Sequence, residues 1–429
     1  MSTVFAQGSP DRVIGKDVKR AAVQAALQFA GDTSRTLVLP PDGTRLHSDA
    51  GVLTQLIYEE VGSGGVFDVM PALGTHFPMS AEELRRMFGP AIPLDAFKEH
   101  NWREDLVRLG VVPAEFVHEV SEGVLRESMP DYDVPVEINS RVVNGGYTAI
   151  LSVGQVLPHE VVGMANGFKN ILVGAGGAET INKSHFLGAA YGMERMMGRA
   201  DTPVRAVLNY AHDHYLKDLG IIYVLTVMGR DHRGETVMRG VFVGDGHDTF
   251  LEAARLSQQV NVTLLDSPPR RVTAYLDPEE FKSTWLGNKS VYRTRMAIAD
   301  GGELTVLAPG VKTFGEDPEI DRLIRRYGYK GTPATLEAVR DRDDLRKNLS
   351  AAAHLIHGSS EGRFRIVYCT DPALMTREEV ESVGFEWRNL ADAMADYDPV
   401  RLVDGPQEGF YYVGQPALGL WAVRSKFEG

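Results

Sequence analysis

Short apolar runs alternate with segments of helical spacing along most of this chain, and this alternation limits its fold more than any other feature. The run at 36–40 follows a helix-like segment at 16–30, and the run at 67–73 follows one at about 49–60. The alternation resumes after 271, with candidate strands at 272–276, 304–308, 364–369 and 411–414. Strands that alternate with helices are typical of parallel sheets covered by helices. We therefore predict an α/β protein.

A chain of 429 residues is long enough for two domains. Two prolines in 266–271 interrupt the pattern between a helix and a new strand, so we place the boundary there. The predicted domains are 1–265 and 266–429, each with a mostly parallel sheet flanked by helices. Within the first domain, 221–228 and 237–243 predict a hairpin. Further helices are predicted at 318–327, 345–357, 377–383 and 389–397.

Composition excludes several classes of protein. The chain is 43% hydrophobic and 24% charged, which are ordinary values for a globular enzyme. A net charge of −13 argues against binding of nucleic acid or of an anionic membrane surface. Cys369 is the only cysteine, so neither disulfides nor a cysteine-based zinc site is expected. No apolar run approaches the roughly 18 residues of a membrane span, and 1–17 lack a signal-peptide core, so we predict a cytoplasmic protein.

Two of the predicted strands end in polar loops. The first loop contains Asp42, Thr44 and Arg45, and the second contains Gly74, Thr75, His76, Phe77 and Pro78. A capping-box pattern from Ser80 to Glu83 then opens a helix. Ligands bind at the carboxyl edge of open α/β sheets, so the two loops predict a site, although each could also be ordinary turn chemistry.

The stretch 159–185 holds two histidines, Lys169 and several glycines. Lys169 precedes an apolar run at 170–173 that we interpret as a buried strand. The loop after it, with Gly174, Gly176 and Gly177, predicts backbone amides close to a ligand. His185 is expected to open a helical segment at 186–197. The alternative is a plain turn with a surface lysine and a helix-start histidine.

Three other histidines are less informative. His100, taken alone, is more typical of a surface or capping histidine. His212 and His214 could chelate zinc as a pair, but their surroundings favour a solvated polar segment.

The ordered set of these motifs resembles the lactate racemases that use the nickel-pincer nucleotide cofactor. The resemblance covers most of 36–250 and rests on the loop from Asp42 to Arg45, the loop from Gly74 to Pro78, His100, and the register of His159, Lys169 and His185. It implies that the first domain binds the cofactor and that the active site lies in the cleft between the domains.

The resemblance also implies roles for single residues. Lys169 matches the lysine joined covalently to the cofactor, and His185 matches the ligand that completes a square-planar Ni(II) site. His100 and His159 match two acid/base histidines. The cofactor is expected to contact Thr44, Gly74, Thr75, His76, Gly174, Gly176 and Gly177. Near the substrate, the resemblance places Asp42, Arg45 as the carboxylate clamp, and Lys289 of the second domain.

Such an enzyme is a racemase or epimerase of a 2-hydroxy acid. A base takes the hydroxyl proton while hydride passes from Cα to the cofactor and returns to the other face. The two enantiomers place the hydroxyl on different sides, so two histidines near neutral pKa are needed. The expected partners are the small-molecule acid and the proteins that make the cofactor. No nucleic acid or membrane partner is expected, and the sequence does not indicate an oligomeric state.

Several positions depart from the family pattern. Phe77 stands where the family often has arginine, Leu286 replaces a glutamine beside Trp285, and a second-domain tryptophan is replaced near Asn348. These positions face the substrate, so we expect an acid other than lactate, such as an aromatic, dicarboxylic or sugar acid. Two alternatives are an enzyme with a Schiff-base lysine at Lys169 acting on a carbonyl substrate, and a non-catalytic carrier of the cofactor.

Overall fold

The computed structural model describes residues 2–62, 64–417 and 419–428 and divides them into two compact units. Unit 1 comprises 2–126, Pro130–Ser184 and Met197–Asn261. Unit 2 comprises Glu127–Met129, His185–Met196 and 262–428. The chain thus passes between the units more than once, and the predicted division at 265 and 266 stays a prediction.

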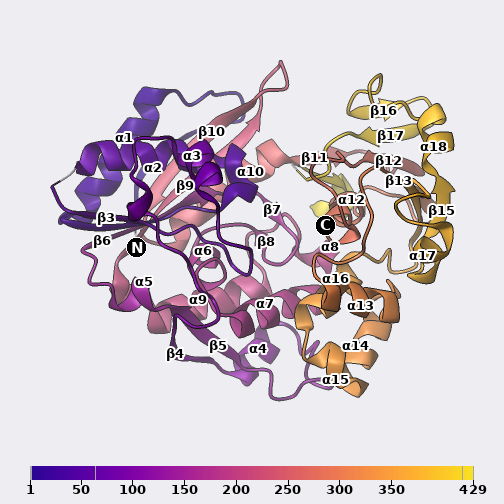
Figure 1. Ribbon diagram of the computed structural model, residues 1–429, viewed down its shortest axis with the longest axis horizontal. Coiled ribbons are helices and arrows are strands. Elements are labelled where there is room, and N and C mark those ends of the chain that lie inside the picture. The colour runs from indigo at the N-terminus through magenta and orange to yellow at the C-terminus, as the bar shows by residue number, and fades with distance from the viewer. Residues whose placement is uncertain (1, 63, 418, 429) are drawn as a thin grey trace. The chain divides into compact units, whose positions relative to one another are not determined.

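Unit 1 is built on a six-stranded sheet in the order β1-β10-β9-β6-β2-β3 (Figure 1). Strands β9, β6, β2 and β3 run parallel, while β10 pairs antiparallel with β1 and β9. The strands are β1 (Thr3–Gly8), β2 (Arg35–Leu39), β3 (Val66–Val69), β6 (Ala149–Gln155), β9 (Ile221–Arg230) and β10 (Thr236–Gly244). The hairpin β9–β10 confirms the one predicted from the sequence.

Helices cover both faces of this sheet. Val23 of α1 (Lys16–Ala30) and Leu53 of α2 (Ala50–Val61) share one buried core with Val241 of β10. The preceding residue of β10, Gly240, faces the opposite side of the sheet. A Cβ there would lie 2.4 Å from Cδ2 of Leu256 in α10 (His247–Asn261), so α10 covers that side. Helix α3 (Ala81–Phe88) packs into the same core as α1 and α2.

The rest of unit 1 carries the loops and short elements near the site. Two short antiparallel pairs are present, β4 with β5 and β7 with β8. The elements are β4 (Leu106–Val112), α4 (Ala114–Val120), β5 (Val134–Asn139), α5 (Ser140–Asn144), β7 (Pro158–His159), β8 (Gly163–Met164), α6 (Phe168–Leu172) and α9 (Pro203–Tyr215). Helix α7 (Ala178–Tyr191) begins in unit 1, and its residues from His185 onward belong to unit 2.

Unit 2 has its own six-stranded sheet, in the order β15-β14-β13-β12-β17-β16. All neighbouring strands are parallel except β16, which pairs antiparallel with β17 at one edge. The strands are β12 (Arg271–Tyr275), β13 (Gly302–Ala308), β14 (Phe364–Thr370), β15 (Glu386–Asn389), β16 (Gly405–Gln407) and β17 (Phe410–Val413). A separate parallel pair joins β11 (Val262–Leu265) to β18 (Leu420–Val423).

Unit 2 also contains helices that lie before, between and after its strands. They are α8 (Met193–Met196), α11 (Thr284–Gly287), α12 (Lys289–Thr294), α13 (Pro318–Tyr327), α14 (Thr332–Asp341), α15 (Asp343–Arg346), α16 (Leu349–His357), α17 (Arg377–Ser382), α18 (Leu390–Asp396) and α19 (Arg424–Phe427). The predicted α/β fold class, with a mostly parallel sheet in each part, is confirmed. Among the described residues, no helix is both long enough and apolar enough to cross a membrane.

The sequence interpretation was wrong at two places in the stretch 159–185. The apolar run at 170–173 forms most of helix α6 rather than a strand. His185 lies two turns inside α7 rather than at a helix start. The positive end of a helix dipole therefore does not act on His185, because that effect fades within the first turn.

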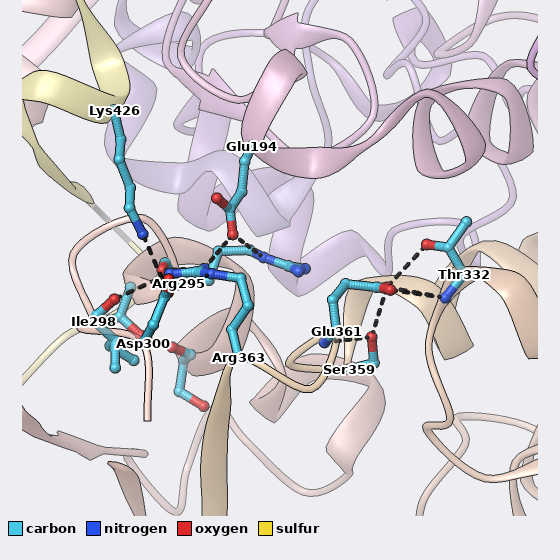
Figure 2. A network of polar contacts seen from close by, with 11 residues as sticks. Glu194, Arg295, Ile298, Asp300, Thr332, Ser359, Glu361, Arg363 and Lys426 are labelled. Atoms are coloured by element: carbon cyan, nitrogen blue, oxygen red, sulfur yellow. Dashed lines mark hydrogen bonds and ion pairs between the residues drawn. The ribbon is translucent and has the colours of Figure 1, made fainter. Parts of the chain in front are cut away.

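An ion-pair network around the buried Arg295 links the segment His185–Met196 to the rest of unit 2 (Figure 2). Glu194 of α8 accepts hydrogen bonds from Nε of Arg295, at 3.3 Å, and from Nη1 of Arg363. Arg363 also donates to Oδ1 of Asp300 at 2.9 Å and to the carbonyl of Ile298 at 3.1 Å. One carboxylate thus joins α8 to the end of α12 and the start of β14.

Candidate functional site

The first part of the site forms where β2 ends. Asp42 is buried and caps a 3-10 segment, η1 (Gly43–Ser48), by accepting from the Thr44 amide at 3.3 Å and from its hydroxyl at 2.5 Å. The other carboxylate oxygen lies 2.6 Å from Nδ1 of His76, in the loop after β3. The carboxyl ends of two neighbouring parallel strands therefore bring an acid and a histidine together.

This contact controls the charge of Asp42 and the orientation of His76. Burial raises the pKa of Asp42, but the hydrogen bonds from His76 and Thr44 and the charge of Arg45 outweigh burial, so the pKa lies below its usual value. The carboxylate is therefore charged at neutral pH and holds Nδ1 of His76. The His76 side chain is 60% exposed, so Nε2 is the nitrogen available to a substrate.

The loop that carries His76 is anchored on both sides. Before it, Gly74 has a φ of 58°, and its amide donates to the carbonyl of Gly174 at 2.8 Å. After it, Ser80 and Glu83 form the capping box that the sequence predicts. The loop is thus held by α3 on one side and by the loop after α6 on the other.

Helix α6 brings Lys169 to the same edge of the sheet. The side-chain amide of Asn170 donates to the carbonyl of Leu39 at 2.9 Å and to the hydroxyl of Ser152 at 3.0 Å. Leu39 and Ser152 lie near the carboxyl ends of β2 and β6. These two bonds fix α6 against the sheet, and the adjacent Lys169 is only half-buried.

The amine of Lys169 is made more nucleophilic by its surroundings. Burial and the charge of Arg45 lower the pKa of Lys169 to about 8, with Glu160 and Asp42 acting in the opposite direction. These effects also show that Lys169, Arg45 and Asp42 lie within electrostatic range of one another. Near pH 8 about half of such an amine is neutral, which covalent bond formation requires.

The glycine loop after α6 has a structural task. The amides of Gly174 and Gly177 donate to the carbonyls of Lys169 and Glu137, each at 3.1 Å. A Cβ on Gly176 would lie 2.0 Å from the carbonyl oxygen of Leu172. Close backbone packing therefore requires glycine here, and the bonded amides of Gly174 and Gly177 are not open to a ligand in this structure.

His100 is satisfied inside the protein. Its side chain is 1% exposed, its Nε2 lies 3.1 Å from the carbonyl of Gly176, and its Nδ1 accepts from the Asn139 side chain at 3.1 Å. Burial lowers the pKa of His100, partly offset by the Gly176 carbonyl and by Asp105. The ring is thus neutral, with its proton on Nε2, and it supports the glycine loop.

His159 lies in the short pair β7–β8. It is 6% exposed, and its Nδ1 accepts from the amide of Val161 at 3.1 Å. That bond places the proton of the neutral ring on Nε2. Glu160, which influences Lys169, has a carboxylate oxygen 3.8 Å from Nδ1 of His159.

His185 and Lys289 of the predicted site belong to unit 2. His185 is half-buried on α7. Lys289 is the first residue of α12, and its Nζ lies 3.7 Å from Oε1 of Glu280. Across the described ranges, no three or more His, Cys, Asp or Glu side chains are grouped to hold a metal ion.

The sequence did not predict the burial of two polar residues of unit 1, Arg205 and His212. Arg205 of α9 donates to the carbonyls of Asn166 and Met164 at 3.1 and 2.6 Å. Burial lowers its pKa to about 9, so it stays charged at pH 7, and its charge contributes to lowering the pKa of Lys169. His212 is 3% exposed and stacks on Phe168 at 3.7 Å, so the predicted solvated segment is wrong there. Both residues lie among apolar residues at helical spacing, and this pattern could have indicated their burial.

Fold and site together define an α/β protein with a nucleophilic lysine and an acid–histidine pair at the carboxyl edge of a sheet. Residues 11–196 match the family model described as the lactate racemase N-terminal domain. Residues 11–196 are therefore similar to the N-terminal domain of the lactate racemases, which confirms the predicted resemblance over this part of the chain.

Solved structures agree with this fold. A crystal structure of a Thermotoga maritima protein has a TM-score of 0.78 at 23% identity, over 98% of this chain and 100% of that one. The lactate racemase apoprotein from Thermoanaerobacterium thermosaccharolyticum has a TM-score of 0.69 at 14% identity, over 97% of this chain and 94% of that one. A search of curated protein sequences finds no significant match.

Proposed function

We propose that this protein is a racemase or epimerase of a 2-hydroxy acid that works with a covalently bound nickel-pincer nucleotide. The proposal is supported most by the match of residues 11–196 to the lactate racemase N-terminal domain, within which Lys169 has a lowered pKa. When bound, the nucleotide would accept hydride from the substrate and return it. The imidazole of His185 would be a ligand of its nickel ion, as the resemblance implies.

The residues present fit this cofactor. A half-buried amine with a pKa near 8 suits amide formation with a carboxyl-derived group. His185 lies within helix α7, and its side chain is half-buried. The nucleotide would be supplied by other proteins.

Arg45 and His76 would handle the substrate in unit 1. The guanidinium of Arg45 would hold the substrate carboxylate. His76, oriented by Asp42, would take the hydroxyl proton at Nε2 and give it back in the reverse direction. His159 would serve the other enantiomer, as the sequence predicts. The acid/base role predicted for His100 lacks a free ring nitrogen in this structure, so we assign that role to His76 instead.

The test is intact-mass and nickel analysis of protein produced together with a cofactor-making pathway. A nickel-bearing adduct that maps to Lys169 and is absent from Lys169→Ala is expected. Racemisation should then follow in a panel of 2-hydroxy acids. An unmodified, nickel-free chain despite active cofactor supply would contradict the proposal.

A Schiff-base enzyme is the second candidate, because it too needs a lysine with a lowered pKa. Borohydride treatment with a carbonyl substrate would then trap an adduct on Lys169. His185→Ala distinguishes the two, since a Schiff-base enzyme would keep its activity and a nickel enzyme would lose its nickel.

A further inference from the structure

Phe77 is held almost entirely in solvent beside the candidate acid/base histidine. Its side chain is 93% exposed, more than any other large hydrophobic side chain among the described residues. Single exposed hydrophobic side chains are common on protein surfaces, but Phe77 directly follows His76, which the proposed function places at the substrate.

The exposure is fixed by the loop and is not fraying. The amide of His76 donates to the carbonyl of Leu73 at 3.0 Å, and Nδ1 of His76 is held by Asp42. On the other side, Met79 packs against the core of unit 1 and Ser80 caps α3. Anchors on both sides of Phe77 thus direct its ring away from the core.

His76, which precedes Phe77, and Arg45, which acts on the Asp42 that holds His76, match the other groups of a 2-hydroxy acid. Arg45 is a partner for a carboxylate, and Nε2 of His76 is a partner for a hydroxyl. A 2-hydroxy acid has one further substituent on C2, its side chain. Phe77 adds an apolar aromatic surface to this set, where an arginine would have favoured a polar or acidic substituent.

We propose that Phe77 selects 2-hydroxy acids with an apolar, aromatic side chain by packing against that side chain. The proposal rests on the proposed racemase function and names its substrate class. Contact with a phenyl ring is worth roughly 10- to 100-fold in affinity when it removes both rings from water.

The experiment compares nickel-loaded wild type, Phe77→Ala and Phe77→Arg on phenyllactate and lactate. We expect the wild type to have the higher kcat/KM with phenyllactate. The ratio of the two kcat/KM values should fall at least about tenfold in Phe77→Ala, mainly through KM for phenyllactate, and further in Phe77→Arg. Phe29→Ala is the matched control, since Phe29 is 40% exposed at the far end of α1, and its ratio should equal that of the wild type.

The outcomes separate this inference from the function on which it rests. Two results would overturn the selection by Phe77 and leave the racemase function intact. The first is a nickel-loaded wild type that prefers lactate. The second is a Phe77→Ala variant whose kcat/KM falls equally with both substrates. An equal effect of Phe77→Ala on both substrates would mean that another part of the protein, and not the substrate, covers the Phe77 ring. A loaded wild type that racemises no acid overturns both.

Discussion

Nδ1 of His76 lies 2.6 Å from Oδ2 of Asp42, and this pair joins the loops that follow two neighbouring strands of unit 1. A buried carboxylate that holds one ring nitrogen leaves the other directed to solvent in a defined tautomer. The pair therefore supplies a proton acceptor whose orientation does not depend on substrate.

Replacement of His76 should affect turnover much more than stability. His76→Asn removes the group that takes the proton in one direction and returns it in the other, so kcat should fall by roughly 100-fold or more in both directions. Because the side chain is 60% exposed, the melting temperature should change little. Kinetics of the loaded enzyme in both directions and thermal melts check this. Unchanged kcat in both directions would exclude His76 as the base.

His100→Ala should show the opposite pattern. The ring is fully buried with two hydrogen bonds, so the substitution should cost about 2–4 kcal/mol of unfolding free energy. The folded-state pKa of His100 is lowered, so its contribution is complete above the unfolded value of about 6.5 and declines as pH falls below it. Urea unfolding of both proteins at pH 5 and pH 8 measures the effect. A larger loss at pH 5 than at pH 8 would contradict it.

Lys169 should react with amine reagents at unusually low pH. Because its pKa is about 8, acylation of the cofactor-free protein at this residue should be half-maximal near pH 8. Ordinary lysines, with a pKa of about 10.4, need more alkaline solution. Arg45→Gln should move the midpoint upward, since the charge of Arg45 is one cause of the shift. Peptide mapping after brief acetylation gives the profile, and an identical midpoint in Arg45→Gln would contradict this cause.

Glu194→Gln should destabilise unit 2. The side chain of Arg295 is only 4% exposed, and loss of the carboxylate leaves a buried guanidinium without its charged partner. Glu194 itself is partly exposed, so we expect about 1–3 kcal/mol in urea unfolding. Glu381→Gln removes an exposed partner of Arg377 and serves as the control, with an expected change below about 0.5 kcal/mol. Equal effects in the two variants would refute the importance of the network.

The sequence predicted correctly those features that depend on interactions between residues close together in the chain. The capping box at Ser80 and the hairpin β9–β10 depend on neighbouring residues alone, and both are present. Helix α6 was missed because a run of four apolar residues has no distinctive period, and the bonds of Asn170 to Leu39 and Ser152 are long-range.

The histidines show the same limit within the site. The sequence gives no sign that Asn139 and Gly176 occupy both ring nitrogens of His100, or that Asp42 holds His76. The arrangement of the two loops at one sheet edge was predictable from strand direction. Which histidine is free to act depends on contacts between distant segments.

Because the loop around Phe77 is anchored on both sides, substitutions of its exposed side chain need not affect folding stability. Its fixed ends, at Gly74 and Ser80, keep the acid–histidine pair in place, while the exposed side chain between them contributes little to folding. Substitutions at position 77 are then nearly neutral for stability, so related proteins can diverge there without first acquiring compensating changes. Under the role that we propose for Phe77, single substitutions at this position would change the preferred acid with little effect on stability.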